Sequence, residues 1–167
     1  MSYLEPEKLI RTEEWFAAIE PLLQNGYKFK ICPVGQSMVP FLAGGRDEAV
    51  LSIPDDAYKY RRNDIVLYKI ENGLFVLHRI CRVDKKGIYT LGDSNTGIEG
   101  PLKHDEILAL VDYIIRKGKI IRSNDRMYIV LVNIWRFIRP FRPAVIKLYT
   151  VFRYLEKKIK NGKVSAR

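Results

Sequence analysis

The sequence predicts a mainly β domain with helices on both sides of it. Three observations predict this fold class. Short apolar runs separated by turn residues fill residues 27–121, which is the pattern of successive strands. Apolar residues recur at helical spacing before residue 26, and a nearly continuous apolar run broken by prolines follows residue 122. We therefore divide the chain into an N-terminal helix (1–26), a β core (27–121) and a basic, apolar helical tail (122–167).

The N-terminal helix is predicted over residues 6–24. Pro6 suits the first turn of a helix, because an N–H at that position would have no intrahelical partner. Asn25-Gly26 is a typical end signal. The apolar stripe comprises Leu9, Trp15, Phe16, Ile19, Leu22 and Leu23. The charged residues among positions 1–20 leave no apolar core of a secretory signal, so no targeting peptide is expected.

Six apolar runs in the middle of the chain predict strands. They are Tyr27–Pro33, Ala49–Ile53, Asp64–Ile70, Leu74–Val83, Gly87–Leu91 and Ile107–Ile115. Asn72-Gly73 predicts a hairpin turn, and Lys85-Lys86-Gly87 predicts a second one. Cys32 and Cys81 fall within two of these runs, at a spacing that matches no metal or redox motif. Both cysteines are therefore expected to be reduced core residues.

The tail carries the positive charge of the chain. Residues 116–167 contain 15 Lys or Arg and two Asp or Glu, whereas the remainder is slightly acidic. The apolar run Met127–Ile138 is shorter than the roughly 20 residues that cross a bilayer. Pro140 and Pro143 break this run, and Ala144–Ile159 predicts a second helix.

This combination of apolar and basic residues predicts a helix that lies in a membrane interface. We expect an anionic membrane surface as a partner and a peripheral, membrane-associated location. A helix pair that only docks on the β core, in a cytoplasmic protein, is the alternative. Nucleic acid is not an expected partner, because the tail lacks a recognisable reading motif.

Three residues have the types that nucleophilic catalysis requires. Ser37 lies in Gly35-Gln36-Ser37-Met38-Val39-Pro40, His78 in His78-Arg79-Ile80, and Asp93 in Gly92-Asp93-Ser94-Asn95. A serine hydroxyl is a weak nucleophile near neutral pH, so it needs a base to accept its proton and often a carboxylate to orient that base. The chain supplies a candidate for each role.

These segments, together with Arg62-Asn63-Asp64-Ile65-Val66, resemble the S24/S26 serine peptidases in their order along the chain. The resemblance covers roughly residues 30–116 and is closest to the S26 signal peptidases. Histidine at position 78 is similar to the Ser/His type found in SipW-like, archaeal and endoplasmic reticulum enzymes. The resemblance implies a signal peptidase/LexA-like β core.

The resemblance implies specific roles for the site residues. Ser37 is the implied nucleophile, His78 the general base, and Asp93 the acid that orients His78. Glu99, six positions after Asp93, is the alternative acid. Met38 and Val39 are expected to line the substrate cleft.

Two further expectations concern neighbours of these residues. Gly35 stands where many members of the family have a hydroxyl residue, which leaves the backbone N–H of Ser37 as the expected oxyanion donor. Arg79 follows His78 on the opposite face of the same strand, where a structural ion pair with an acid is its expected use.

The sequence thus predicts a serine endopeptidase that cleaves a peptide or protein precursor, with an extended substrate beside a strand near Ser37. No cofactor and no metal are expected, since a Ser/His mechanism requires neither and the chain carries no cofactor motif. The alternative is a catalytically silent or self-cleaving regulatory or adaptor protein on the same fold, associated with a membrane surface.

Overall fold

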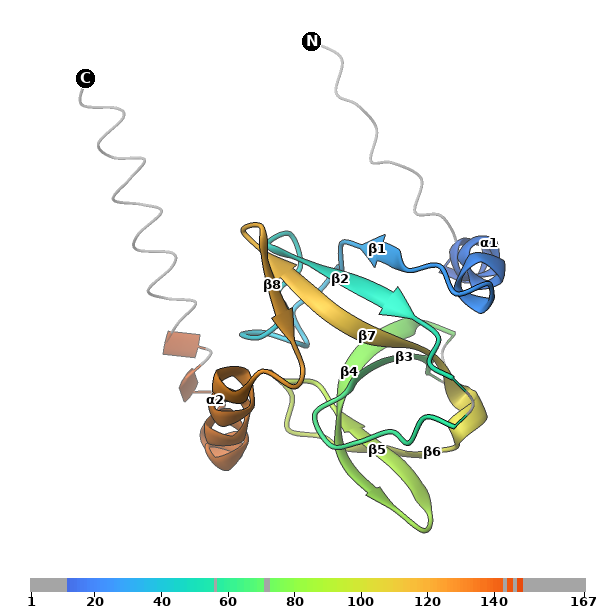
Figure 1. Ribbon diagram of the computed structural model, residues 1–167. Coiled ribbons are helices and arrows are strands. Elements are labelled where there is room, and N and C mark those ends of the chain that lie inside the picture. Colours follow the sequence, from blue (N-terminus) through green and yellow to red (C-terminus); the bar gives the residue numbers. More distant parts are fainter. Residues whose placement is uncertain (1–11, 56, 71–72, 143, 146, 149–167) are drawn as a thin grey trace, which may run out of the picture.

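The computed structural model describes residues 12–55, 57–70, 73–142, 144–145 and 147–148. Its main element is one antiparallel sheet of eight strands. Helices α1 (Thr12–Gln24) and α2 (Arg126–Phe137) lie at opposite ends of this sheet (Figure 1). The predicted mainly β fold with flanking helices is therefore confirmed.

The sheet has the strand order β1-β2-β7-β3-β4-β5-β6, and β8 pairs with β7. Each of the six predicted runs overlaps one strand, whereas β6 and β8 were not predicted. β6 contains Gly100-Pro101, two residue types that are depleted in strands. The strand bounds are β1 (Phe29–Ile31), β2 (Asp47–Ser52), β3 (Ile65–Lys69), β4 (Phe75–Asp84), β5 (Gly87–Leu91), β6 (Glu99–Leu102), β7 (Ile107–Arg116) and β8 (Lys119–Arg122).

Short turns join the strands around the site. Asp84 pairs with Gly87 across the β4–β5 turn, which confirms the turn predicted there. β3 and β4 pair antiparallel from Lys69 opposite Phe75, as a hairpin requires. Asn72 of the other predicted turn lies outside the described residues.

Helix α1 continues to Gln24, and Gly26 follows it with a φ of 81°, a conformation that favours glycine. The predicted first part of this helix, residues 6–11, lies outside the described residues. Phe16, Ile19 and Leu23 are its buried residues. The predicted apolar stripe is thus confirmed in part, because Leu22 is exposed and Leu9 lies outside the described residues.

Alternation along β4 places neighbouring side chains on opposite faces of the sheet. Leu77 belongs to the larger buried cluster, which also includes residues of α1, α2, β2 and β7. Ile80 belongs to a smaller cluster with Tyr68 and Val66 of β3. His78 shares the face of Ile80, and Arg79 shares the face of Leu77, so these two residues enter different environments.

The tail departs from the expectations in part. Helix α2 matches the predicted apolar run, and the 3₁₀ turn η2 (Arg139–Phe141) contains Pro140. Of the predicted helix Ala144–Ile159, residues 144, 145, 147 and 148 are helical, and residues 149–159 lie outside the described part. Within the described residues, no helix combines the length and the apolar character that crossing a membrane requires.

The two cysteines are free, but they are not core residues. Cys32 is exposed and Cys81 is partly exposed. Cys32 follows the last residue of the short edge strand β1, and no strand in the described part of the chain covers it. The prediction that both thiols are buried in the core, which rested on the apolar runs around them, is therefore wrong.

Candidate functional site

His78 is held by side chains from two other strands. The residue lies in β4 opposite Val66 of β3 and is 4% exposed. Its Nδ1 atom is 3.1 Å from Glu99 Oε2 and 3.0 Å from the hydroxyl of Tyr68. One ring nitrogen is thus fully engaged, whereas Nε2 makes no hydrogen bond within the described residues.

Tyr68 fixes the direction of these hydrogen bonds. Its hydroxyl donates to Glu99 Oε2 and lies 2.8 Å from Thr90 Oγ1. Burial, together with the bond to Glu99, raises the pKa of Tyr68 well above its ordinary value, so the phenol keeps its proton. Because the phenol O–H points to Glu99, we infer that the Nδ1 atom of His78 is the donor in its contacts with Tyr68 and Glu99. The neutral imidazole then carries its lone pair on Nε2.

Glu99 reaches His78 through the pairing of β4, β5 and β6. Ile80 pairs with Thr90, and Thr90 pairs with Glu99, so the three strands bring Glu99 to the face that carries His78. The side chain of Glu99 is 39% exposed, and it lines a hollow of about 660 Å³ together with Tyr68. Solvent therefore reaches this carboxylate while it contacts His78.

Asp93 serves a different partner, which corrects the expectation that it orients His78. Its two carboxylate oxygens accept hydrogen bonds of 2.9 and 2.7 Å from Nε and a terminal nitrogen of Arg79. Both side chains are nearly fully buried. Because Arg79 and His78 point to opposite faces of β4, an acid that pairs with Arg79 lies on the wrong face for His78. The ion pair predicted for Arg79 is confirmed, with Asp93 as its acid.

The Ser37 loop is supported by the turn that follows β5. The backbone N–H of Ser94 donates to the carbonyl of Ser37 at 2.8 Å, and the hydroxyl of Ser94 donates to the carbonyl of Gln36 at 3.0 Å. A Cβ at Gly92 would lie 2.8 Å from the same Ser37 carbonyl, so only glycine permits this approach. The loop that carries Ser37 and the turn that carries Asp93 therefore form one packed unit.

Ser37 lines a groove to which β4, the strand of His78, also contributes. Ser37 and Leu77, the residue before His78, line the same groove. Neither the hydroxyl nor the backbone N–H of Ser37 makes a hydrogen bond within the described residues, and the hydroxyl is thus not bonded to His78 here. Both groups of Ser37 are consequently available to a substrate.

The groove beside Ser37 has a volume of about 540 Å³ and mainly apolar walls. Strand β1 forms one side of it. β1 is the last strand of the sheet, so one of its edges has no neighbouring strand among the described residues. Met38 lines the groove as expected, whereas Val39 does not. The other lining residues are Trp15, Phe29, Lys30, Ile31, Cys32, Pro33, Val34, Gly35, Leu42, Leu67, Phe75 and Val76.

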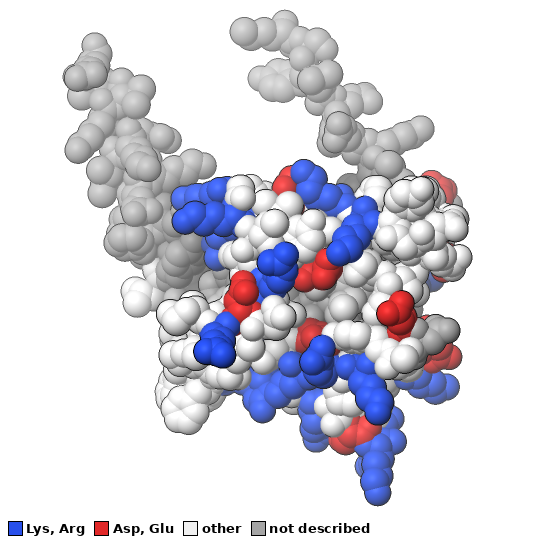
Figure 2. All heavy atoms as spheres, viewed as in Figure 1, with Lys and Arg blue, Asp and Glu red and all other residues white. Residues whose placement is uncertain are grey.

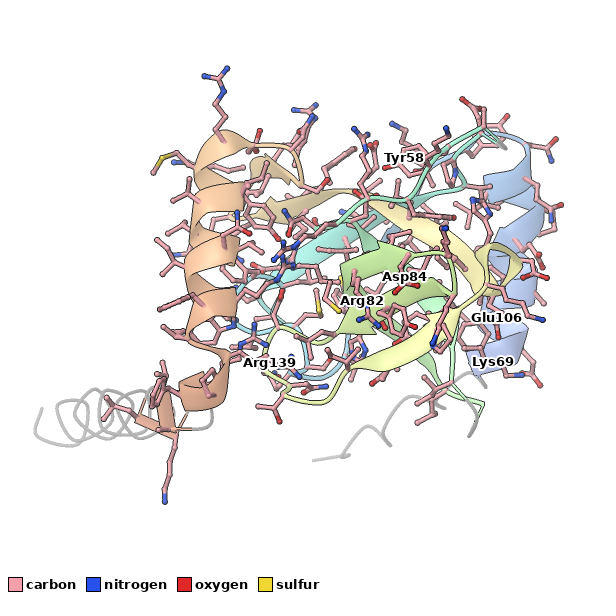
Figure 3. All side chains as sticks on the ribbon, turned by 90° about the horizontal axis from the view of Figure 1, so that it is seen from below. Tyr58, Lys69, Arg82, Asp84, Glu106 and Arg139 are labelled. Atoms are coloured by element: carbon pink, nitrogen blue, oxygen red, sulfur yellow. The ribbon has the colours of Figure 1, made fainter. Side chains whose placement is uncertain are left out.

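The tail reaches the same site, which the sequence did not predict. The indole N–H of Trp135 donates to the carbonyl of Asp93, and Arg142 donates to the carbonyl of Asn95 at 2.8 Å. Arg139 of η2, which is labelled in Figure 3, donates to the carbonyl of Thr96. Helix α2 and η2 therefore hold the turn on which the Ser37 loop rests. A Trp and spaced arginines in an otherwise apolar segment were the only signal of this role.

Comparisons of the chain with protein-family models, with curated proteins and with solved structures found no match. Within the described residues, no group of three or more His, Cys, Asp or Glu side chains is arranged to hold a metal ion.

Proposed function

We propose that this chain is a serine endopeptidase similar to the Ser/His type of signal peptidase, with Ser37 as nucleophile and His78 as general base. The hydrogen bonds that His78 Nδ1 makes with Glu99 and Tyr68 carry this proposal. A general base needs a fixed orientation and a free lone pair, and these contacts supply both. Glu99, and not Asp93, is the acid that positions the base in this proposal.

The reaction begins when a peptide carbonyl approaches Ser37. His78 Nε2 takes the hydroxyl proton as Ser37 Oγ bonds to the carbonyl carbon, and the backbone N–H of Ser37 donates to the developing oxyanion. The imidazolium then gives its proton to the leaving amine, the C–N bond breaks, and an ester on Ser37 remains. Water, activated by the same imidazole, hydrolyses the ester. The contact between Ser37 and His78 forms with substrate, since catalytic hydrogen bonds often tighten only in the complex.

The proposed substrate is an extended peptide in the groove beside β1. The open edge of β1 offers backbone groups for strand addition, which aligns a peptide with the loop that leads to Ser37. Apolar walls, to which Phe29 and Met38 contribute, favour apolar side chains next to the cleavage site. The natural precursor is thus expected to present a short apolar, extended segment.

The test is cleavage of a peptide library by the wild type and by Ser37→Ala and His78→Ala, in detergent or with anionic liposomes, followed by mass spectrometry. We expect each variant to lose at least about 10³-fold in kcat/KM. His104→Ala and Ser52→Ala are matched controls that remove the same side chains elsewhere, and both are expected to stay within twofold of the wild type. Cleavage by Ser37→Ala at the wild-type rate would reject the proposal. Absence of wild-type cleavage under every condition would instead favour a silent adaptor.

A further inference from the structure

Helix α2 has a second apolar side that faces away from the domain. Its outward residues are 51–89% exposed, although all are large and apolar. At 3.6 residues per turn they lie within an arc of roughly 120°. Side chains along the outer side of the helix point away from the sheet in Figure 3. These outward residues, here called the outer stripe, are Met127, Val130, Leu131, Ile134 and Phe137, and Phe141 of η2 is also exposed.

The outer stripe is not needed to hold α2 on the domain. Tyr128 and Val132, on another side of the helix, are buried in the larger core cluster. The hydroxyl of Tyr128 accepts a hydrogen bond from Arg79, and Trp135 and Arg142 donate to the turn after β5. The inner side of α2 is thus fixed by packing and by hydrogen bonds. The outer stripe is consequently presented on a rigid scaffold.

The surroundings of the outer stripe are strongly basic. Residues 116–148 contain nine Lys or Arg and one acidic residue, Asp125; five of the nine cations are exposed, namely Lys117, Lys119, Arg122, Arg126 and Lys147. Exposed cations lie both in the β7–β8 hairpin and at the start of α2, for example Lys119, Arg122 and Arg126. In Figure 2, Lys and Arg side chains gather at the upper left, near the β7–β8 hairpin, above a largely uncharged surface over α2.

We propose that the outer stripe of α2 lies in the interfacial layer of an anionic membrane, with the surrounding Lys and Arg on the lipid headgroups. An amphipathic helix with aromatic and aliphatic residues on one side and cations beside them binds in the plane of such an interface. The basic excess selects an anionic bilayer over a neutral one. The twelve-residue helix is too short to cross, so it lies along the surface. This inference does not depend on the proposed peptidase activity.

The test is flotation of the full chain with vesicles of phosphatidylcholine alone or of phosphatidylcholine with phosphatidylserine. We expect binding to the anionic vesicles at least tenfold stronger than to the neutral ones, weakened by high salt because surface charges are screened. Ile134→Gln with Phe137→Gln should reduce binding at least tenfold. The matched control, Val83→Gln with Ile53→Gln, replaces exposed apolar residues elsewhere and should bind as the wild type does.

A second pair of variants tests the charges. Arg122→Gln and Arg126→Gln should each weaken binding to anionic vesicles about fivefold, the factor expected for one cation near such a surface. All substituted residues are exposed, so circular dichroism and the melting temperature should match those of the wild type.

Three outcomes would overturn the inference. The first is no flotation with anionic vesicles, or equal flotation with the Ile134→Gln and Phe137→Gln variant. The second is binding that deletion of residues 149–167 abolishes while that variant leaves it intact, which would assign the contact to the end of the chain. The third is a concentration-dependent dimer that the same variant dissociates, which would make the outer stripe a contact between two copies of this chain.

Discussion

Replacement of Asp93 by Asn should destabilise the fold because it breaks a buried ion pair. Arg79 and Asp93 are 2% and 4% exposed, and two hydrogen bonds join them. Arg79 also donates to the hydroxyl of Tyr128 at 2.8 Å and to the carbonyl of Asn63 at 3.0 Å. Burial would lower the pKa of Arg79, but Asp93 and Tyr128 outweigh that effect and raise the pKa above its ordinary value. Because an arginine starts from so high a pKa, the guanidinium stays charged in the Asp93→Asn variant as well.

The expected cost follows from that buried charge. Removal of one partner of a buried pair costs about 3–5 kcal/mol of unfolding free energy, because the other charge loses its counterion away from water. For a chain of this size each kcal/mol corresponds to about 2–4 °C, so the melting temperature should fall by roughly 6–20 °C. Asn keeps the size of Asp, which isolates the charge from the packing.

Urea unfolding followed by circular dichroism measures this cost, with equal m-values as the check that the two states remain comparable. Glu99→Gln is the matched control, since its side chain is 39% exposed and its loss should cost less than about 1 kcal/mol. The reasoning would be refuted if Asp93→Asn left the stability within about 1 kcal/mol of the wild type, well below the cost of an unpaired buried charge. A large loss of kcat with unchanged stability would return Asp93 to the role of catalytic acid.

Three other predictions follow from contacts in the site and in the core. Glu99→Gln should lower kcat by about 10²- to 10⁴-fold at nearly unchanged stability, because the imidazole of His78 loses the carboxylate that orients it. A steady-state assay in which kcat stays within threefold of the wild type would contradict this prediction. Gly92→Ala should lower kcat/KM at least about tenfold, since the new Cβ would lie 2.8 Å from the Ser37 carbonyl. Gly97→Ala is the control and should match the wild type, because a Cβ at Gly97 meets nothing within 4 Å. Burial alone would raise the pKa of Asp47, but hydrogen bonds from two arginines lower the pKa below its ordinary value of 3.8. The ionised carboxylate therefore stabilises the fold above about pH 4, and this contribution is lost as the pH falls further. Urea titrations between pH 5 and pH 2 should show this loss in the wild type and a flatter profile in Asp47→Asn.

The alternation of side chains was the part of the site that the sequence predicted well. A run of strand-forming residues around His78 placed Arg79 on the opposite face, and an ion pair with an acid was expected there. The structure confirms both points. Local periodicity was sufficient, because the two residues are neighbours in one strand.

The choice between Asp93 and Glu99 could not be made in this way. Both acids follow β5 within a few residues, and only the pairing of β5 with β6 decides which one reaches His78. The sequence of β6 contains Gly-Pro, so this strand was not expected and its register was unknown. Tyr68 was missed for a related reason, since its hydroxyl meets Glu99 only after the four strands β3 to β6 have assembled.

The contacts of α2 with the site could not be predicted from the sequence either. The apolar run predicted a helix, but its composition does not reveal which side packs on the domain. Trp135 and Arg142 belong to the tail that was predicted to lie in a membrane interface, and in the structure they donate hydrogen bonds to the turn after β5. Long-range contacts of this kind are set by the tertiary arrangement and not by local preference.

The most direct test of the proposed chemistry is mass spectrometry of the chain after rapid acid quench of its reaction with a cleaved peptide. We predict an acyl group, with the mass of the N-terminal product, on the proteolytic fragment that contains Ser37, and no such adduct in Ser37→Ala, which should also fail to cleave. An adduct on a different residue, or undiminished cleavage by Ser37→Ala, would contradict the assignment of Ser37 as the nucleophile.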